Sequence, residues 1–168
     1  MRRRIVIAGT AAAAASIGTG LWYRNSGPNP TEAIWHMRFE RPDGSELLLS
    51  DFKGKPLLLN FWATWCPPCV KELPLLDRFQ REQRARGWRV VGLAIDQRGP
   101  VREYLERLPV GFDVGLAGFD GADLARSLGN TGGGLPYTIV FDRKGNIAHR
   151  RLGSIQPDDL AGWSTSVE

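Results

Sequence analysis

The chain has 168 residues, of which 42% are hydrophobic and 24% charged, a composition that excludes a disordered tail, a collagen-like repeat and a polytopic membrane protein. Its net charge of +4 comes from Arg2, Arg3, Arg4 and Arg24, which precede the first acidic residue, Glu32. Subtracting these four from the 22 basic residues leaves 18, which balance the 18 acidic ones. A nucleic-acid-binding function therefore loses its main support.

Residues 1–24 have the pattern of a signal peptide or an N-terminal membrane anchor. Nineteen uncharged residues, 5–23, follow the three arginines, and the small-residue tract at 11–16 fits a secretory signal. The length of the run would just span a bilayer, so the sequence leaves cleavage and retention open. A twin-arginine address is an alternative to a plain basic signal. A buried cytosolic helix fits such a segment poorly, so we expect export to the periplasm or to the outer face of the cytoplasmic membrane, an oxidising compartment.

Residues 25–31 are predicted to form a linker, because Gly27, Pro28 and Pro30 break a helix. The domain would then comprise residues 32–168. It begins with two predicted strands, 35–39 and 46–49, joined by a turn that contains proline and glycine. This pattern predicts an N-terminal β-hairpin.

A buried strand and a long helix follow. Residues 56–62 are apolar except for Asn60, as expected for a central strand covered on both faces. Residues 68–86 are predicted to be a helix that has an arginine-rich last turn and stops at Gly87. Its apolar positions recur at helical spacing: Val70, Leu73, Leu76 and Phe79.

The rest of the domain is predicted to contain both strands and helices. We predict a strand at 90–95, helices at 101–108 and 123–128, a hairpin of strands at 137–141 and 147–151, and a closing helix at 157–163. Strands joined by helices pair in parallel, whereas hairpins pair antiparallel. The fold class is therefore α/β, with a mixed central sheet flanked by helices. Asp96 directly follows the second buried strand, and no role is assigned to it.

Cys66 and Cys69 are the only cysteines, and they form a CxxC motif where the buried strand meets the helix. A structural bridge across so small a loop would remove little chain entropy, so redox chemistry is the better explanation. At the helix N-terminus, free N–H groups and the helix dipole lower the pKa of Cys66, which makes it the attacking sulfur. Cys69 is three residues further along and less exposed, in a position to resolve a mixed disulfide.

Metal and haem chemistry fit these cysteines poorly. A structural zinc site needs four ligands, but only His36 and His149 are available and neither has ligand spacing to the cysteines. A c-type haem site needs a histidine directly after the second cysteine, where this chain has Val70. We therefore expect no metal and no cofactor other than the redox-active Cys66–Cys69 disulfide.

Residues 62–69, WATWCPPC, resemble the active-site signature of thioredoxins. Pro74 matches the helix-kinking proline of that family, and Pro136 matches its cis proline. The order of elements also agrees from residue 47 to residue 153. The resemblance implies a thioredoxin fold.

Within that superfamily the chain is most similar to TlpA-like and ResA-like thiol-disulfide reductases. The similarity rests on the export segment, on the hairpin that ends in residues 49–55 and on the segment 109–131 before the cis proline. In that family the last of these segments adds an inserted helix, which residues 118–128 would supply here.

The resemblance also implies site residues. Pro136 would present the backbone of Leu135 to an extended substrate peptide. Trp65 and Pro67 belong to the active-site signature, and they are assigned to substrate binding together with Leu135 and Pro136. Trp62 could join this apolar rim, although core packing is its simpler role.

One departure concerns proton transfer. Thioredoxin has a buried aspartate where this chain has Asn60, and an amide cannot move protons. ResA-like proteins have a glutamate three residues after the second cysteine, and Glu72 occupies that position. Its spacing lets it approach Cys69 on the helix, so we expect Glu72 to have a raised pKa and to relay a proton. The alternative is an exposed glutamate paired with Lys71 or a nearby arginine.

These observations predict an exported reductant of disulfides in cell-envelope proteins, recharged by a transmembrane thiol electron donor. Pro68 before Cys69 favours reduction, because strong oxidants of the superfamily have histidine there. The resemblance suggests cytochrome c maturation, and membrane contact is expected only through the N-terminal segment. The substrate, the donor, the redox potential and the oligomeric state are left open.

Several other functions are alternatives. A thiol oxidase or an isomerase could use the same fold. A peroxiredoxin-type peroxidase would need a lone peroxidatic cysteine, and a binding module would not need the cysteines. Copper delivery usually requires a longer cysteine spacing and a histidine ligand.

Overall fold

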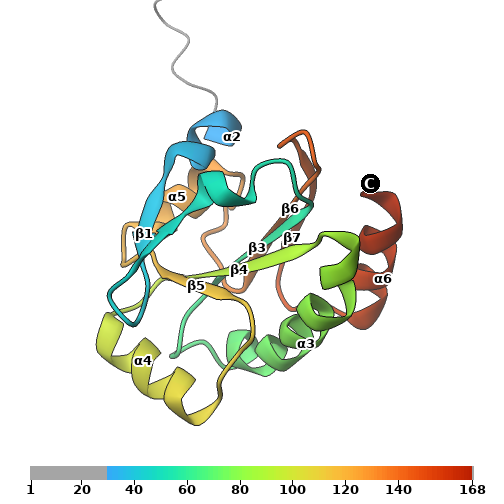
Figure 1. Ribbon diagram of the computed structural model, residues 1–168. Coiled ribbons are helices and arrows are strands. Elements are labelled where there is room, and N and C mark those ends of the chain that lie inside the picture. Colours follow the sequence, from blue (N-terminus) through green and yellow to red (C-terminus); the bar gives the residue numbers. More distant parts are fainter. Residues whose placement is uncertain (1–29, 168) are drawn as a thin grey trace, which may run out of the picture.

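The computed structural model describes residues 30–167 of the chain. At its centre is strand β3 (Leu57–Trp62), whose six residues are all buried, as the continuous apolar run predicted. Strand β4 (Arg89–Ala94) pairs with β3 in parallel, and β5 (Asp113–Leu116) pairs with β4 in parallel. On the other side of β3, β6 (Tyr137–Phe141) pairs antiparallel. These strands form the middle of a mixed sheet (Figure 1).

Two hairpins complete the sheet. Strands β1 (Arg38–Glu40) and β2 (Glu46–Leu48) form the expected N-terminal hairpin, which joins the sheet where β1 pairs antiparallel with β5. At the opposite edge, β7 (Ile147–Leu152) pairs antiparallel with β6. The strand order is β2-β1-β5-β4-β3-β6-β7.

Helices cover both faces, as predicted for an α/β fold. Helices α3 (Pro67–Gln83), α4 (Arg98–Arg107) and α6 (Pro157–Ser166) pack on one face, and α3 and α6 lie side by side (Figure 1). Helix α5 (Gly121–Ser127) and two short 3-10 helices, η1 (Ile34–His36) and η2 (Leu49–Phe52), pack on the other.

The alternation of side chains along β3 produces two apolar cores. Leu58 and Trp62 point into the core under α3 and α6, whereas Leu57, Leu59 and Phe61 point into the core under η1 and α5. A strand buried on both faces therefore connects the two layers. Because β3 is packed on both faces, the loop that follows it starts from a well-held strand at one edge of the sheet.

The start of the domain differs from the prediction. The first strand begins at Arg38 rather than Trp35, because η1 buries Ile34 and Trp35. The Trp35 ring packs edge-on against Phe141, and its Nε1 donates to the carbonyl of Gly145 at 3.4 Å. Long-range burial of an aromatic residue thus overrides the strand preference of the segment.

Helix α2 (Pro30–Ala33) falls partly within the predicted linker. Proline is tolerated at the first helical position, where its missing N–H is not needed, so Pro30 starts a helix here instead of breaking one. The predicted export segment, residues 1–24, and residues 25–29 of the predicted linker lie outside the described residues. Within residues 30–167, no helix has the length and apolar character required to cross a bilayer.

The long helix α3 ends close to the predicted position. It is followed by a 3-10 turn, η3 (Arg84–Arg86), and then by Gly87, whose φ of +90° favours glycine and stops the helix. Pro74 lies inside α3, as the resemblance implied. The inserted helix expected within 118–128 is α5, whereas strand β5 before it was not predicted.

Candidate active site

The two cysteines lie at the N-terminus of α3, directly after the loop that follows β3. Cys66 is the N-cap residue of α3, and its sulfur accepts a hydrogen bond from the backbone N–H of Cys69 at 3.3 Å. Pro67 and Pro68 occupy the first turn, where a helix does not use their missing N–H groups. A disulfide joins Cys66 and Cys69, whose Cα atoms are 5.2 Å apart.

The two sulfurs differ in accessibility. Cys66 is 5% exposed and Cys69 is 0% exposed. Cys69 is therefore the less exposed of the two cysteines, as predicted. The Cys69 N–H, which points at the Cys66 sulfur, and the positive end of the helix dipole favour a thiolate at this position in the reduced protein.

Asp96 anchors the loop that carries the motif. Its Oδ2 accepts hydrogen bonds from the backbone N–H of Thr64 at 2.9 Å and from the Thr64 hydroxyl at 2.5 Å, and its Oδ1 accepts from the N–H of Gln97 at 2.7 Å. β3 and β4 are parallel, so the loops after them meet at one edge of the sheet. Sequence reasoning assigned Asp96 no role. The signal that could have revealed it is an acidic residue just past the end of β4, the strand that pairs in parallel with β3.

Glu72 is buried, with 4% of its surface exposed. Its Oε1 accepts a hydrogen bond from Asn60 Nδ2 at 2.8 Å, and its Oε2 accepts one from the backbone N–H of Ile155 at 2.9 Å. Burial raises the pKa of Glu72, and these two hydrogen bonds oppose the rise. The alternative of an exposed glutamate paired with Lys71 is wrong.

The residues assigned to substrate binding differ in exposure. Trp65 is 61% exposed and Pro67 is also exposed, whereas Leu135 is half-buried and Pro136 is buried. The peptide bond between Leu135 and Pro136 is cis, as the resemblance implied. Trp62 belongs to the core, with 0% exposure, and does not join an apolar rim.

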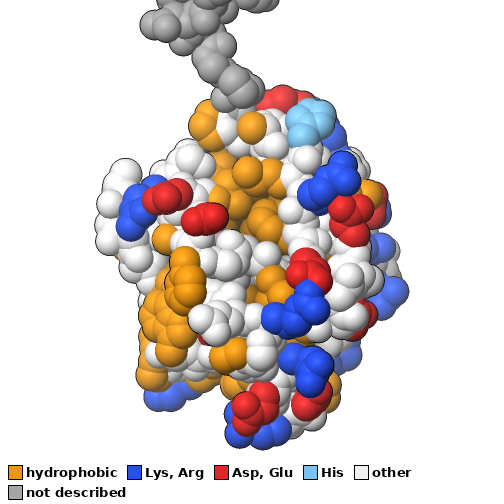
Figure 2. Space-filling model, turned by 90° about the vertical axis from the view of Figure 1, so that its left-hand side faces the viewer, with side chains coloured by type: hydrophobic (Ala, Val, Ile, Leu, Met, Phe, Trp, Pro, Cys, Tyr) orange, Lys and Arg blue, Asp and Glu red, His pale blue; other side chains and the backbone are white. Residues whose placement is uncertain are grey.

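Leu152 is an apolar side chain near the cis proline that sequence reasoning missed. It is 53% exposed and pairs with Tyr137 across β6 and β7, while the next residue, Gly153, donates its N–H to the carbonyl of Pro136 at 2.9 Å. Only the register of β7 places it there. Figure 2 shows one side of the molecule, on which hydrophobic side chains gather in the centre and at the lower left, while most charged side chains lie along the right-hand side and the bottom.

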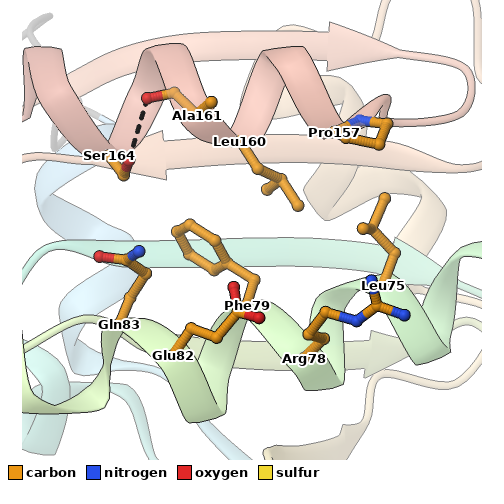
Figure 3. A pocket seen from close by; sticks show the side chains of 9 residues that line it. All are labelled: Leu75, Arg78, Phe79, Glu82, Gln83, Pro157, Leu160, Ala161 and Ser164. Carbon is orange, nitrogen blue, oxygen red and sulfur yellow. Dashed lines mark hydrogen bonds between the residues drawn. The ribbon is translucent and has the colours of Figure 1, made fainter.

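Two of the cavities that border α3 lie toward α6 and the loop before it. The larger, of about 310 Å³, lies between α3 and α6, where Leu75 and Phe79 point toward Pro157 and Leu160 (Figure 3). The smaller, of about 210 Å³, is lined by Glu72 and Lys71 and shares Leu75 and Pro157 with the larger one. Residues 30–167 contain no group of three or more side chains arranged to hold a metal ion.

Comparisons with known proteins agree with this geometry. The model of the Redoxin family matches residues 28–163. The thiol-disulfide oxidoreductase ResA of Bacillus thuringiensis is 29% identical over 131 residues, which cover 74% of this chain and 70% of ResA. The thiol:disulfide interchange protein DsbE of Vibrio cholerae is 38% identical over 108 residues, covering 63% of this chain and 54% of DsbE.

Solved structures are similar as well. A thiol:disulfide interchange protein of the thioredoxin family from Chlorobium tepidum superimposes with a TM-score of 0.67 at 29% identity. The alignment covers 78% of this chain and 92% of that protein. The predicted thioredoxin fold is therefore confirmed.

Proposed function

This chain belongs to the Redoxin family, and from that premise we propose that it is a dithiol reductant that cleaves disulfides in exported proteins. The observation that carries the proposal is the Cys66–Cys69 disulfide at the N-terminus of α3, with the more accessible sulfur at the helix cap. The ResA and DsbE relatives are thiol-disulfide oxidoreductases by name, which supports the same chemistry here.

The reaction takes place in two exchanges. The Cys66 thiolate attacks one sulfur of the substrate disulfide, forming a mixed disulfide and releasing one substrate thiolate, which takes up a proton. Cys69 then loses its proton and attacks the sulfur of Cys66, which releases the second substrate thiolate. Two electrons pass to the substrate, and the protein keeps the Cys66–Cys69 disulfide.

Glu72 is proposed to accept the proton that Cys69 loses. It lies three residues after Cys69 on α3 and is buried, and its raised pKa makes its carboxylate a better base than an exposed glutamate. Glu72→Gln should therefore slow the second exchange in a pH-dependent way. An unchanged pH profile of exchange in this variant would remove Glu72 from the mechanism.

Substrate binding is proposed at the surface formed by Trp65, Pro67, Leu135 and Pro136, to which we add Leu152. Exposed apolar side chains at Trp65 and Leu152 suit the apolar residues of an extended peptide. The backbone groups of Leu135 form no hydrogen bond with any other described residue, so they are free to pair with a substrate strand.

Residues 1–24 are proposed to export the domain, as a signal peptide or an anchor, with residues 25–31 as a linker to the domain that follows. The chain would then act in the periplasm or at the outer face of the cytoplasmic membrane, on disulfide-containing envelope proteins. Apocytochrome c is the substrate that the resemblance suggests. A transmembrane thiol donor would restore the dithiol, without any cofactor beyond the disulfide.

The direction of the reaction is tested by the midpoint potential of the full chain, equilibrated in redox buffers and followed by Trp fluorescence. We expect about −230 to −270 mV, the range of dithiol reductants. A value of about −120 to −180 mV would instead assign thiol oxidation or isomerisation to the same site.

The order of the two exchanges is tested by trapping. Cys69→Ser should accumulate mixed disulfides with envelope proteins through Cys66, because the resolving sulfur is absent. Cys66→Ser is the matched control and should accumulate far fewer, because Cys69 is fully buried. Equal trapping by the two variants would contradict the assignment of Cys66 as the attacking sulfur.

A further inference from the structure

Asn60 occupies the middle of β3, directly opposite Thr138 in the register of β3 with β6. Both side chains are 0% exposed. Asn60 Nδ2 donates to Thr138 Oγ1 at 2.9 Å and to Glu72 Oε1 at 2.8 Å. The amide therefore links the central strand to the carboxyl group on α3.

The other end of this amide has no hydrogen bond. Asn60 Oδ1 is buried and lacks a partner among the described residues. A buried carbonyl without a partner loses its hydrogen bond to water and gains none in return, and an apolar side chain at the centre of a strand avoids that cost. The presence of an amide here therefore needs an explanation beyond packing.

The donors around Glu72 match its ionised form. An ionised carboxyl group only accepts hydrogen bonds, and Oε1 and Oε2 each face a donor, Asn60 Nδ2 and the N–H of Ile155. When Glu72 carries a proton, one of its oxygens must donate. The backbone N–H of Ile155 cannot accept that bond, and neither can the amino end of Asn60.

We propose that Asn60 is the positioning residue of Glu72 and that its amide serves both protonation states of that carboxyl group. With Glu72 ionised, the amino end donates to Oε1. With Glu72 protonated, a half-turn about the Cβ–Cγ bond of Asn60 brings Oδ1 to the same place. There Oδ1 accepts from the carboxylic acid and from the hydroxyl of Thr138, which is a hydrogen-bond donor as well as an acceptor.

This inference rests on the proposed function, in which Glu72 gains and loses a proton in each cycle. The hydrogen bond from Asn60 lowers the pKa of Glu72, against the effect of burial. The other titratable groups near Glu72 are the thiols of the reduced Cys66 and Cys69 at the start of α3 and Lys71, which lines the same cavity. Asn60 and Thr138, on β3 and β6, are uncharged, and the loop before α6 approaches through the N–H of Ile155.

The unmodified protein provides the first test. The carboxyl carbon of Glu72 and the side-chain amide of Asn60 can be followed by NMR as the pH is changed. We expect the amide signals of Asn60 to shift with the same midpoint as Glu72, and to lose their pH dependence in Glu72→Gln. Asn60 signals that stay constant while Glu72 titrates would overturn the inference.

Two variants that keep the branching and the number of heavy atoms of the side chain separate positioning from packing. Asn60→Leu removes the donor, so the midpoint of Glu72 should move to higher pH, and the pH profile of thiol-disulfide exchange should move with it. Thr138→Val is the matched control, because it leaves the bond from Asn60 to Glu72 in place and should shift the midpoint less. An unchanged midpoint in Asn60→Leu contradicts the inference, and if that variant does not fold, the NMR titration of the unmodified protein decides.

Failure of the proposed function gives a different result. If Glu72 does not relay protons, Glu72→Gln leaves the pH profile of exchange unchanged while the signals of Asn60 still titrate with Glu72 in the unmodified protein. If Asn60 does not position Glu72, Glu72→Gln alters the profile and the signals of Asn60 do not titrate.

Discussion

Replacing Asp96 with alanine should destabilise the loop that carries the CxxC motif. The carboxylate is 6% exposed and accepts three hydrogen bonds, two from Thr64 and one from the N–H of Gln97. Thr64 precedes Cys66 by two residues. The side chain of Asp96 therefore ties the loop after β3 to the loop after β4, and no other described side chain hydrogen-bonds to Thr64.

The expected loss follows from these contacts. A hydrogen bond to a charged group contributes about 1.5–3 kcal/mol to stability, and neighbouring bonds do not add fully. Gln97 is exposed and Thr64 is half-buried, so water can replace part of what the carboxylate supplies. We expect the free energy of unfolding of Asp96→Ala to fall by about 2–4 kcal/mol.

The assay is urea unfolding of the oxidised protein, followed by Trp fluorescence. Thr64→Val removes only the hydroxyl bond and should cost less than Asp96→Ala. Asp120→Ala is the control, because that aspartate is exposed and, although it is the N-cap residue of α5, its side chain makes no capping hydrogen bond. Its loss should stay below about 0.5 kcal/mol. A loss below about 0.5 kcal/mol in Asp96→Ala would refute the anchoring role.

Two further predictions concern buried groups. Burial raises the pKa of Glu72 above its unfolded value, so the free energy of unfolding should fall as pH rises from the ordinary glutamate range through that raised pKa. The midpoint of urea unfolding, plotted against pH, should therefore have a flatter slope in Glu72→Gln than in the unmodified protein. An equal slope in the two proteins would contradict this prediction. In Gly92→Ala, the new Cβ would lie 3.0 Å from Trp62 Nε1 and 3.1 Å from Phe112 Cε2. Thermal unfolding should therefore report a loss of stability of about 1–3 kcal/mol. Gly99→Ala is the control and should report no loss, because a Cβ at Gly99 would meet open space.

Elements with strong local signals were predicted closely. The apolar run at 57–62 and the apolar spacing of α3 are each contained within a short stretch of chain, and Gly87 marks the end of the helix. Strand β5 was missed because it has four residues and contains a glycine, and it is held by pairing with β4 and with Glu40, far away in the chain. Trp35 was placed in a strand because its contacts with Phe141 cannot be seen locally.

The same distinction applies to the candidate site. The spacing of Cys66 and Cys69 is local, so the sequence predicts a disulfide at a helix N-terminus. The partners of Glu72, by contrast, are 12 and 83 residues away, at Asn60 and Ile155. A glutamate on a helix gives no local sign of whether its side chain faces water or a sheet.

By itself, the sequence determined the α/β organisation, the redox motif and its position at the start of a helix, because hydrophobic period, helix stops and cysteine spacing act over a few residues. The thioredoxin fold was implied by the resemblance of residues 62–69 and Pro136 to that family. Only the tertiary structure decided that Asp96 holds the loop before Cys66, that Glu72 is buried, and that Asn60 connects it to β6. Burial and hydrogen bonding between layers depend on which distant segments meet across the sheet, and no single segment of the chain encodes that meeting.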